Sequence, residues 1–315
     1  MIIKTAILAL AFTSLALSAT TLAQDPNPPA AKSAGPTVQV SLIVTDGKDK
    51  SLNTISKDDV RLVEDKVAQT VLSVEPDARP VDLGIAIDAS GSLRRFINPI
   101  LEAGRLIVVN RQPKDEIFLE RFISTDKIEK FQDFSSDEKV LLKALDSMYV
   151  EAGQSAIIDA IYTAVHYVAE HNRNSDRRKA LVVFTDGEDR NSYYNIEKLL
   201  KLLHKEKVQV FVVGFILDLD NTQTAIVRAG IRDRAIKLLN TVAGETGGRV
   251  FFPRDNSELG DAVAQIAHDL RGQFQITYQS SNADKKDFRK VDVNLNSAGG
   301  EKRKAIVPRG YASQK

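Results

Sequence analysis

The feature that most constrains the fold is an alternation of strand-like and helix-like segments across the middle of the chain. Apolar strand-like segments occupy residues 81–87, 117–122, 180–184 and 208–215, and the last two are nearly continuous apolar runs. Such runs are typical of strands buried on both faces of a parallel sheet. Apolar residues at helical spacing occupy residues 140–148, 157–168, 231–243 and 259–270, and Ser135 with Glu138 predicts a capping box before the first of these. This alternation predicts an α/β fold with a doubly wound, mostly parallel open sheet.

The two ends of the chain have a different pattern, in which apolar and polar residues alternate with the period of a strand. The alternating residues are Val38, Val40, Leu42 and Val44 near the start, and Phe274, Ile276, Tyr278, Val291, Val293 and Leu295 near the end. Residues 60–63 and 71–74 predict two more strands, and residues 282–286 and 297–300 predict turns. Because so few strands are marginal as an isolated sheet, we expect both ends to build one small β-sandwich into which the α/β domain is inserted.

The first residues have the pattern of an export signal. Lys4 precedes an apolar run over residues 5–19, and the small residues Thr21 and Ala23 predict cleavage after Ala23. The alternative is a permanent membrane anchor, but the run is short for a span of about 20 residues. The predicted domains are therefore a signal peptide at 1–23, a flexible Pro- and Ala-rich linker at 24–36, an α/β domain at 80–271, and a β-sandwich formed by residues 37–79 together with residues 272–315.

Composition narrows the setting in which the protein acts. The net charge of +1 does not favour nucleic acid or a polybasic contact with membranes. The chain of 315 residues has no cysteine, which excludes disulfides, thiolate metal sites and a lipid anchor at the cleavage point. We therefore expect an exported protein, periplasmic or secreted, without a stable membrane anchor.

Three short segments carry hydroxyl and carboxyl groups at predicted strand ends or helix starts. The run Asp88-Ala89-Ser90-Gly91-Ser92 follows the first strand of the α/β domain. Thr185-Asp186-Gly187 follows the third strand, and Ser155 stands just before the helix at 157–168. Ligands of open α/β sheets bind outside the carboxyl ends of the strands. Oxygen ligands suit a hard cation, so the pattern predicts a site for Mg²⁺, with Ca²⁺ or Mn²⁺ as alternatives.

These segments resemble, in their order, the metal-ion-dependent adhesion site of von Willebrand factor type A domains. The resemblance covers residues 81–271 and implies that Ser90, Ser92 and Ser155 bind the metal directly, while Asp88 and Asp186 act through water. The family usually has Thr where this chain has Ser155. Serine keeps the ligand oxygen but lacks the methyl group that restricts the rotamer of threonine. The flanking segments 44–47, 63–65 and 309–311 resemble those of exported VWFA-related proteins common in acidobacteria.

Catalytic motifs are weak by comparison. The Asp88 segment is not a Gly-x-Ser-x-Gly nucleophile elbow, and the chain has neither a phosphate-binding loop nor a dinucleotide-binding glycine motif. None of the four histidines has the context of a catalytic triad. We therefore expect a non-enzymatic binding protein that captures an Asp or Glu carboxylate of a protein partner through the metal. The alternatives are a metal-dependent hydrolase or chelatase-like subunit, and a structural module with a vestigial site.

Overall fold

The computed structural model describes residues 35–220, 225–281, 288–297 and 302–312. The predicted signal peptide, most of the predicted linker and most of the two predicted turns at 282–286 and 297–300 lie outside these residues. The exact domain limits given above stay predictions.

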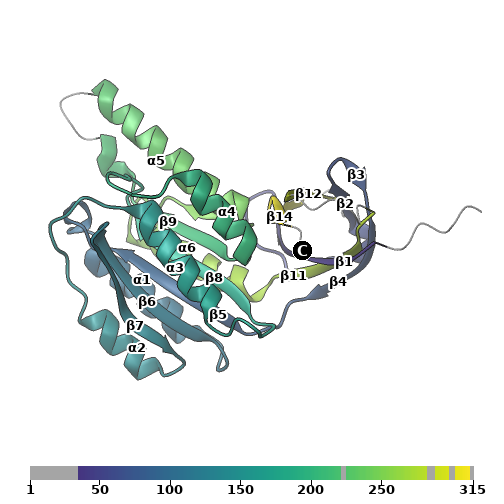
Figure 1. The fold of residues 1–315 in the computed structure, drawn as a ribbon, viewed down its shortest axis with the longest axis horizontal. Helices are drawn as coiled ribbons and strands as arrows, with labels where there is room; N and C mark the ends of the chain where they lie inside the picture. Colours follow the sequence, from purple (N-terminus) through teal and green to yellow (C-terminus); the bar gives the residue numbers. More distant parts are fainter. Residues whose placement is uncertain (1–34, 221–224, 282–287, 298–301, 313–315) are drawn as a thin grey trace, which may run out of the picture. The chain divides into compact units, whose positions relative to one another are not determined.

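A six-stranded sheet with the strand order β10-β9-β8-β5-β6-β7 forms the centre of the described chain (Figure 1). Its strands are β5 (Val81–Asp88), β6 (Glu116–Ser124), β7 (Lys127–Ser135), β8 (Arg178–Thr185), β9 (Gln209–Gly214) and β10 (Val250–Phe251). All neighbouring pairs are parallel except β6 and β7. Every residue of β5 is buried, as expected for a central strand covered on both faces.

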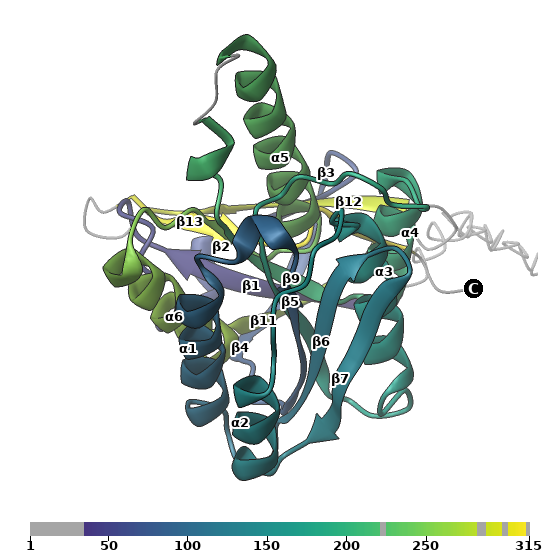
Figure 2. The same ribbon diagram turned by 90° about the vertical axis from the view of Figure 1, so that its left-hand side faces the viewer.

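Helices cover both faces of this sheet, as Figure 2 shows. The helices α1 (Ile97–Val109), α2 (Glu138–Asp146) and α6 (Asn256–Arg271) pack on one face, and α3 (Ile157–Glu170), α4 (Ile196–Glu206) and α5 (Ala225–Glu245) pack on the other. Side chains alternate along β5, so Ile85 and Ile87 join the first core and Ala86 joins the second. This arrangement confirms the predicted doubly wound α/β fold.

Both ends of the chain form a β-sandwich of two four-stranded sheets. One sheet has the order β13-β1-β11-β4 and the other β14-β12-β2-β3. Their strands are β1 (Thr37–Thr45), β2 (Val60–Glu64), β3 (Val67–Ala68), β4 (Thr70–Pro76), β11 (Phe274–Gln279), β12 (Phe288–Leu295), β13 (Lys304–Ile306) and β14 (Gly310–Ala312). The alternating apolar residues of β1 and β11 meet in its core, together with Leu62 and Val291. The α/β domain is therefore an insertion between strands of this sandwich.

A buried polar network joins the two ends inside the sandwich. The Glu64 carboxylate of β2 accepts hydrogen bonds from Tyr278 at 2.5 Å, Ser280 at 2.8 Å and Tyr311 at 2.9 Å. Arg289 of β12 lies 3.5 Å from the same carboxylate, and both side chains are almost inaccessible to solvent. Burial and the negative charge of Glu64 raise the pKa of Tyr278, so its phenol remains a proton donor to this carboxylate.

Several elements differ from the expectations drawn from the sequence. The helices α1 and α4 and the strand β7 were not predicted. Polar residues mask the apolar spacing in α4 and β7, whereas α1 is apolar on most sides and contains the poor helix formers Pro99 and Gly104. The predicted capping box at Ser135 is wrong: the Asp137 side chain caps α2 by accepting from Lys139 and Val140. Ser135 instead accepts a hydrogen bond from the Asp137 amide, so it orients the residue that does the capping.

Candidate metal centre

The predicted site residues come together at the carboxyl edge of the central sheet. Asp88 is the last residue of β5, and Ser90 and Ser92 lie in the turn that follows it. Asp186 comes directly after β8, the neighbour of β5, and Ser155 lies just before α3. Because the carboxyl ends of parallel strands share one edge of a sheet, segments far apart in sequence meet here.

The three serine hydroxyls form a compact cluster. Ser90 Oγ lies 3.0 Å from Ser92 Oγ and 2.9 Å from Ser155 Oγ. Oxygens that share an edge of an octahedron with bonds of about 2.1 Å lie about 3.0 Å apart, which is the geometry that Mg²⁺ requires. The spacing of these hydroxyls therefore fits three ligands of one small divalent cation.

The Asp88 carboxylate supports the cluster from inside the domain. It accepts hydrogen bonds from Ser155 Oγ at 3.1 and 3.2 Å and from Thr185 Oγ1 at 2.9 Å. The amide of Ser90 also donates to it, at 3.0 Å, and so fixes the turn. Asp88 is completely buried, and its carboxylate thus positions two of the predicted ligands without facing solvent.

The electrostatics of this edge favour an added positive charge. Burial, reinforced by the negative charge of Asp186, raises the pKa of Asp88 to about 6. Burial also raises the pKa of Asp186, although the amide of Glu188 and the hydroxyl of Ser92 hydrogen-bond to its carboxylate. Arg190 is a positive charge near these two carboxylates, but it is also paired with Glu188 and does not offset the effect of burial on Asp186. A divalent cation is the group that would supply the remaining counter-charge most directly.

The Asp189 side chain, beside the cluster, caps the amino end of α3. Asp189 Oδ1 accepts from the amides of Ile157 and Ile158 at 2.8 and 3.2 Å, so it caps this helix from another loop. The sequence suggests a solvated rim charge for Asp189, and this interpretation is wrong because a capping side chain distant in sequence is invisible to local spacing. With Asp189 as the cap, the Ser155 hydroxyl is left to join the cluster.

The cluster opens on one side to a cavity of about 220 Å³. Ser92 and Asp186 lie in its wall beside Arg190, Phe215 and Leu219. Gly187 turns the chain away from this wall at a φ of 80°, a conformation that glycine adopts without strain. The cavity gives a ligand from solvent access to the site.

A larger cavity, of about 400 Å³, lies elsewhere, between the sandwich and the amino edge of the central sheet. It contains none of the predicted site residues, and its lining includes Lys179 and Lys207. Lys179 Nζ donates to the carbonyl of Ala169 near the end of α3, and Lys207 directly follows α4. Cations at these positions offset the negative ends of the two helices, although burial lowers the pKa of both lysines.

Comparison with known proteins identifies the central domain. A family model described as the von Willebrand factor type A domain matches residues 82–265. A von Willebrand factor type A protein from Catenulispora acidiphila is 13% identical, with a TM-score of 0.49 over 88% of this chain and 74% of that one. Proximal thread matrix protein 1 of the mussel byssus, solved with a zinc-occupied MIDAS motif, is 18% identical, with a TM-score of 0.49 over 64% of this chain and 48% of that one.

A third similar structure is an aerotolerance-related membrane protein from Bacteroides fragilis, carrying multiple mutations to serine. It is 19% identical, with a TM-score of 0.45 over 60% of this chain and 98% of that one. The curated proteins include no match to the chain.

Proposed function

Because this chain belongs to the von Willebrand factor type A domain family, we propose that it is a metal-dependent binding protein that acts outside the cytoplasm. The observation that carries the proposal is the cluster of three serine hydroxyls, in which Ser90 Oγ lies 2.9 and 3.0 Å from the other two, above two buried carboxylates. Its geometry suits binding of a Mg²⁺-type cation by Ser90, Ser92 and Ser155, with Asp88 and Asp186 behind them.

The proposed mechanism rests on where the charges lie. Ser92 and the Asp186 carboxylate line the cavity, while Ser90 and Ser155 are buried behind them. The Asp88 carboxylate is engaged by Ser155 and Thr185 from within. A cation held by hydroxyls is only partly neutralised, and it would supply the positive charge that attracts a carboxylate of a protein partner. Arg190 lies in the wall of the cavity, beside Glu188, and adds a donor for the second oxygen of that carboxylate.

Exposed aromatic side chains around this edge suit a partner surface. Tyr193 is 79% exposed in the loop after β8, and Tyr149 is 56% exposed in the loop before α3. Large amphipathic rings of this kind contribute much of the binding energy at protein interfaces. We propose that the partner buries both rings while its Asp or Glu side chain enters the cavity.

A hydrolase or chelatase-like activity is the second candidate. Metal-dependent hydrolysis requires a general base within hydrogen-bond reach of the attacking water. Among the described residues, His204 is bonded to Glu245 and His171 to Glu116, and both histidines lie away from the carboxyl edge of the sheet. The carboxylates of Glu188 and Asp218 line the cavity, but Glu188 is paired with Arg190 and Asp218 with Arg95. Binding without catalysis is therefore the simpler function for this arrangement.

The extracytoplasmic location is part of the proposal and rests on the signal-like residues 1–23. Within the described residues, none of the helices combines the length and apolar character needed to span a membrane. N-terminal sequencing of the protein recovered from the periplasm or the medium tests this location. A protein that keeps Met1 and stays in the cytoplasm would contradict it.

Calorimetry with Mg²⁺ tests the metal site. Ser92→Ala removes one proposed ligand and should weaken binding by about tenfold or more. The matched control is Ser257→Ala, which removes an exposed serine from the first turn of α6. An unaltered protein that binds no divalent cation, or a Ser92→Ala variant with unchanged affinity, would show that the site is vestigial.

A pull-down from cell-envelope extract tests the partner. Binding should be lost in chelator and in Asp88→Ala, and Tyr193→Ala should weaken it without changing Mg²⁺ affinity. Binding that persists unchanged in chelator would show that the interaction does not pass through the metal.

A further inference from the structure

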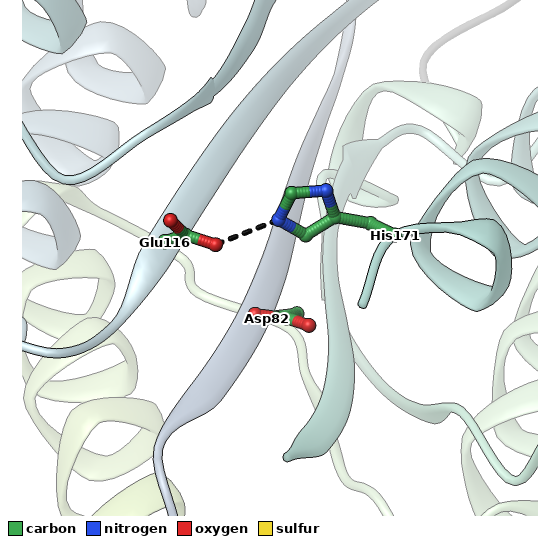
Figure 3. A group of neighbouring side chains, drawn as sticks. All are labelled: Asp82, Glu116 and His171. Atoms are coloured by element: carbon green, nitrogen blue, oxygen red, sulfur yellow. Dashed lines mark hydrogen bonds and ion pairs between the residues drawn. The ribbon is translucent and has the colours of Figure 1, made fainter. Parts of the chain in front are cut away.

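A second group of ligand-type side chains lies at the opposite edge of the central sheet. Asp82 is the second residue of β5, Glu116 is the first of β6, and His171 directly follows α3. Figure 3 shows the three side chains converging from these elements. One ligand atom from each lies within 4.8 Å of the other two.

We propose that Asp82, Glu116 and His171 form a second metal site, selective for a divalent transition metal of the zinc class. Two carboxylate oxygens and one imidazole nitrogen make up a donor set found in zinc sites with an open position. An imidazole ligand also separates this site from the hydroxyl cluster, because Mg²⁺ and Ca²⁺ prefer oxygen.

The register of the sheet favours a cation between the two carboxylates. Asp82 and Glu116 are paired directly across β5 and β6, so their side chains leave the sheet on the same face. Like charges directly opposite one another destabilise a sheet. Asp82 is fully buried, and its burial raises the pKa of its carboxyl although Arg177 and Asn172 both bond to it. The pKa of Glu116, in contrast, is lowered by its hydrogen bond to His171. The buried Asp82 is therefore the carboxyl group that an added cation would favour most.

The imidazole of His171 is held in place for coordination. Its ring stacks on Phe134 with centroids 3.7 Å apart and planes 4° from parallel. Nε2 points at Glu116 and lies 2.7 Å from its carboxylate oxygen. The side chains of His171 and Glu116 are 27% and 35% exposed, which leaves an entry path for an ion. A ring clamped in this way loses little freedom when it binds a metal, and this favours affinity.

Asn172 offers a fourth ligand. Its backbone is held at a φ of 47°, and its side-chain amide lies 3.0 Å from Glu116 and 3.3 Å from Asp82. The oxygen and nitrogen of an amide exchange places by rotation, so Asn172 Oδ1 can face the same point. A tetrahedral set of four protein ligands, or three with one water, is then available.

The Arg177 guanidinium competes with a metal ion for the Asp82 carboxylate. Its Nε lies 2.5 Å from Asp82 Oδ1, and its Nη2 donates to the carbonyl of Lys114. A carboxylate can bond to a guanidinium through one oxygen and to a metal through the other. The alternative is a closed ion-pair network in which Arg177 and His171 already complete the charge balance.

The two proposed sites lie about 20 Å apart, because Asp82 and Asp88 are six residues apart on one strand that rises about 3.3 Å per residue. They can therefore be titrated independently. Calorimetry with Zn²⁺ in excess Mg²⁺, which occupies the hydroxyl cluster, should show one zinc bound at this edge. His171→Ala should lower the affinity at least tenfold, and Arg177→Gln should preserve or increase it.

The control is His166→Ala, which removes an exposed histidine one turn earlier on α3 that faces Glu170. This variant should bind zinc like the unaltered protein. Circular dichroism of His171→Ala checks that the fold is retained, and Glu116→Gln gives a second variant with the histidine intact. Zinc binding that is unchanged in both His171→Ala and Glu116→Gln, or lost equally in His166→Ala, would overturn the proposal. No zinc binding in the unaltered protein would establish the closed ion-pair network instead.

Discussion

Replacing Glu64 with alanine should strongly destabilise the β-sandwich. The carboxylate of Glu64 receives hydrogen bonds from Tyr278, Ser280 and Tyr311 and faces Arg289. Alanine would leave the Arg289 guanidinium, only 1% exposed, without this counter-charge. The cost would come less from the lost attraction than from a buried charge that no longer has its carboxylate.

Measurements on buried ion pairs set the magnitude. Removing one partner of such a pair typically costs about 3–5 kcal/mol. Folded domains are stable by only about 5–15 kcal/mol, so the loss would consume a large share of the stability of the sandwich. The double variant Glu64→Leu with Arg289→Met should recover the part of this loss that comes from the uncompensated charge. It should not recover all of it, because the Tyr278, Ser280 and Tyr311 hydroxyls still lose their acceptor.

Urea unfolding followed by circular dichroism measures this effect. Asp292→Ala is the matched control, because this carboxylate lies on β12 but is exposed. The control should change the stability by no more than about 0.5 kcal/mol. If Glu64→Ala costs less than about 1 kcal/mol, or if the double variant is no more stable than the single one, the network does not hold the two ends of the chain together.

Four further outcomes are expected. Glu120 is buried in the core, its Oε1 has no partner among the described residues, and burial raises its pKa. The folded protein therefore favours the protonated carboxyl, and the stability that this group contributes is present below about pH 4.3 and is lost as the pH rises. Glu120→Gln should therefore reduce the fall in the thermal midpoint between acidic and neutral pH. Asp189→Ala should lower the free energy of unfolding by about 1 kcal/mol through loss of a helix cap, and it should also weaken Mg²⁺ binding. A stability loss with unchanged Mg²⁺ affinity would show that the cap does not position Ser155 for the metal. Ser155→Thr should keep or tighten Mg²⁺ binding in calorimetry, and a tenfold loss would mean that the added methyl does not fit. Intact mass of the exported protein should place its first residue at Gln24, and a mass that retains residues 1–23 would refute cleavage after Ala23.

Sequence patterns predicted the fold class well because the relevant signals are local. The apolar runs of β5, β8 and β9 and the alternation in β1 and β11 follow directly from which faces are buried. Helix α4 was missed because its solvent face carries many polar residues, and α1 was missed because it is apolar on most sides and contains Pro99 and Gly104. Capping by Asp137 was assigned to the wrong residue. In each case the local sequence is compatible with two structures, such as helix or loop, or two capping residues, and tertiary packing selects one of them.

The candidate metal centre was predictable only as a set of residues. Motif order indicated that Asp88, Ser90, Ser92, Ser155 and Asp186 belong together, and their role as ligands stays a prediction. Their support from Thr185 and Asp189 was not predictable, because those contacts join separate loops. The group at Asp82 and Glu116 gave no sequence signal either: its members are 34 residues apart by number, and only the register of β5 against β6 places them side by side.

The sandwich built from both ends of the chain imposes an order on folding. Thr37 of β1 pairs with Gln279 of β11, and Ile43 pairs with Ile306 of β13. During synthesis or export from the amino end, β1 therefore stays an unpaired edge until the residues of β11 and β13 are also available. Pairing between strands so far apart in sequence is slow. Prior folding of the inserted α/β domain shortens the effective loop, since β4 and β11 pair where the chain enters and leaves it. We therefore expect the inserted domain to fold before the sandwich closes, because a late-folding insert would leave β1 open to pairing with other chains.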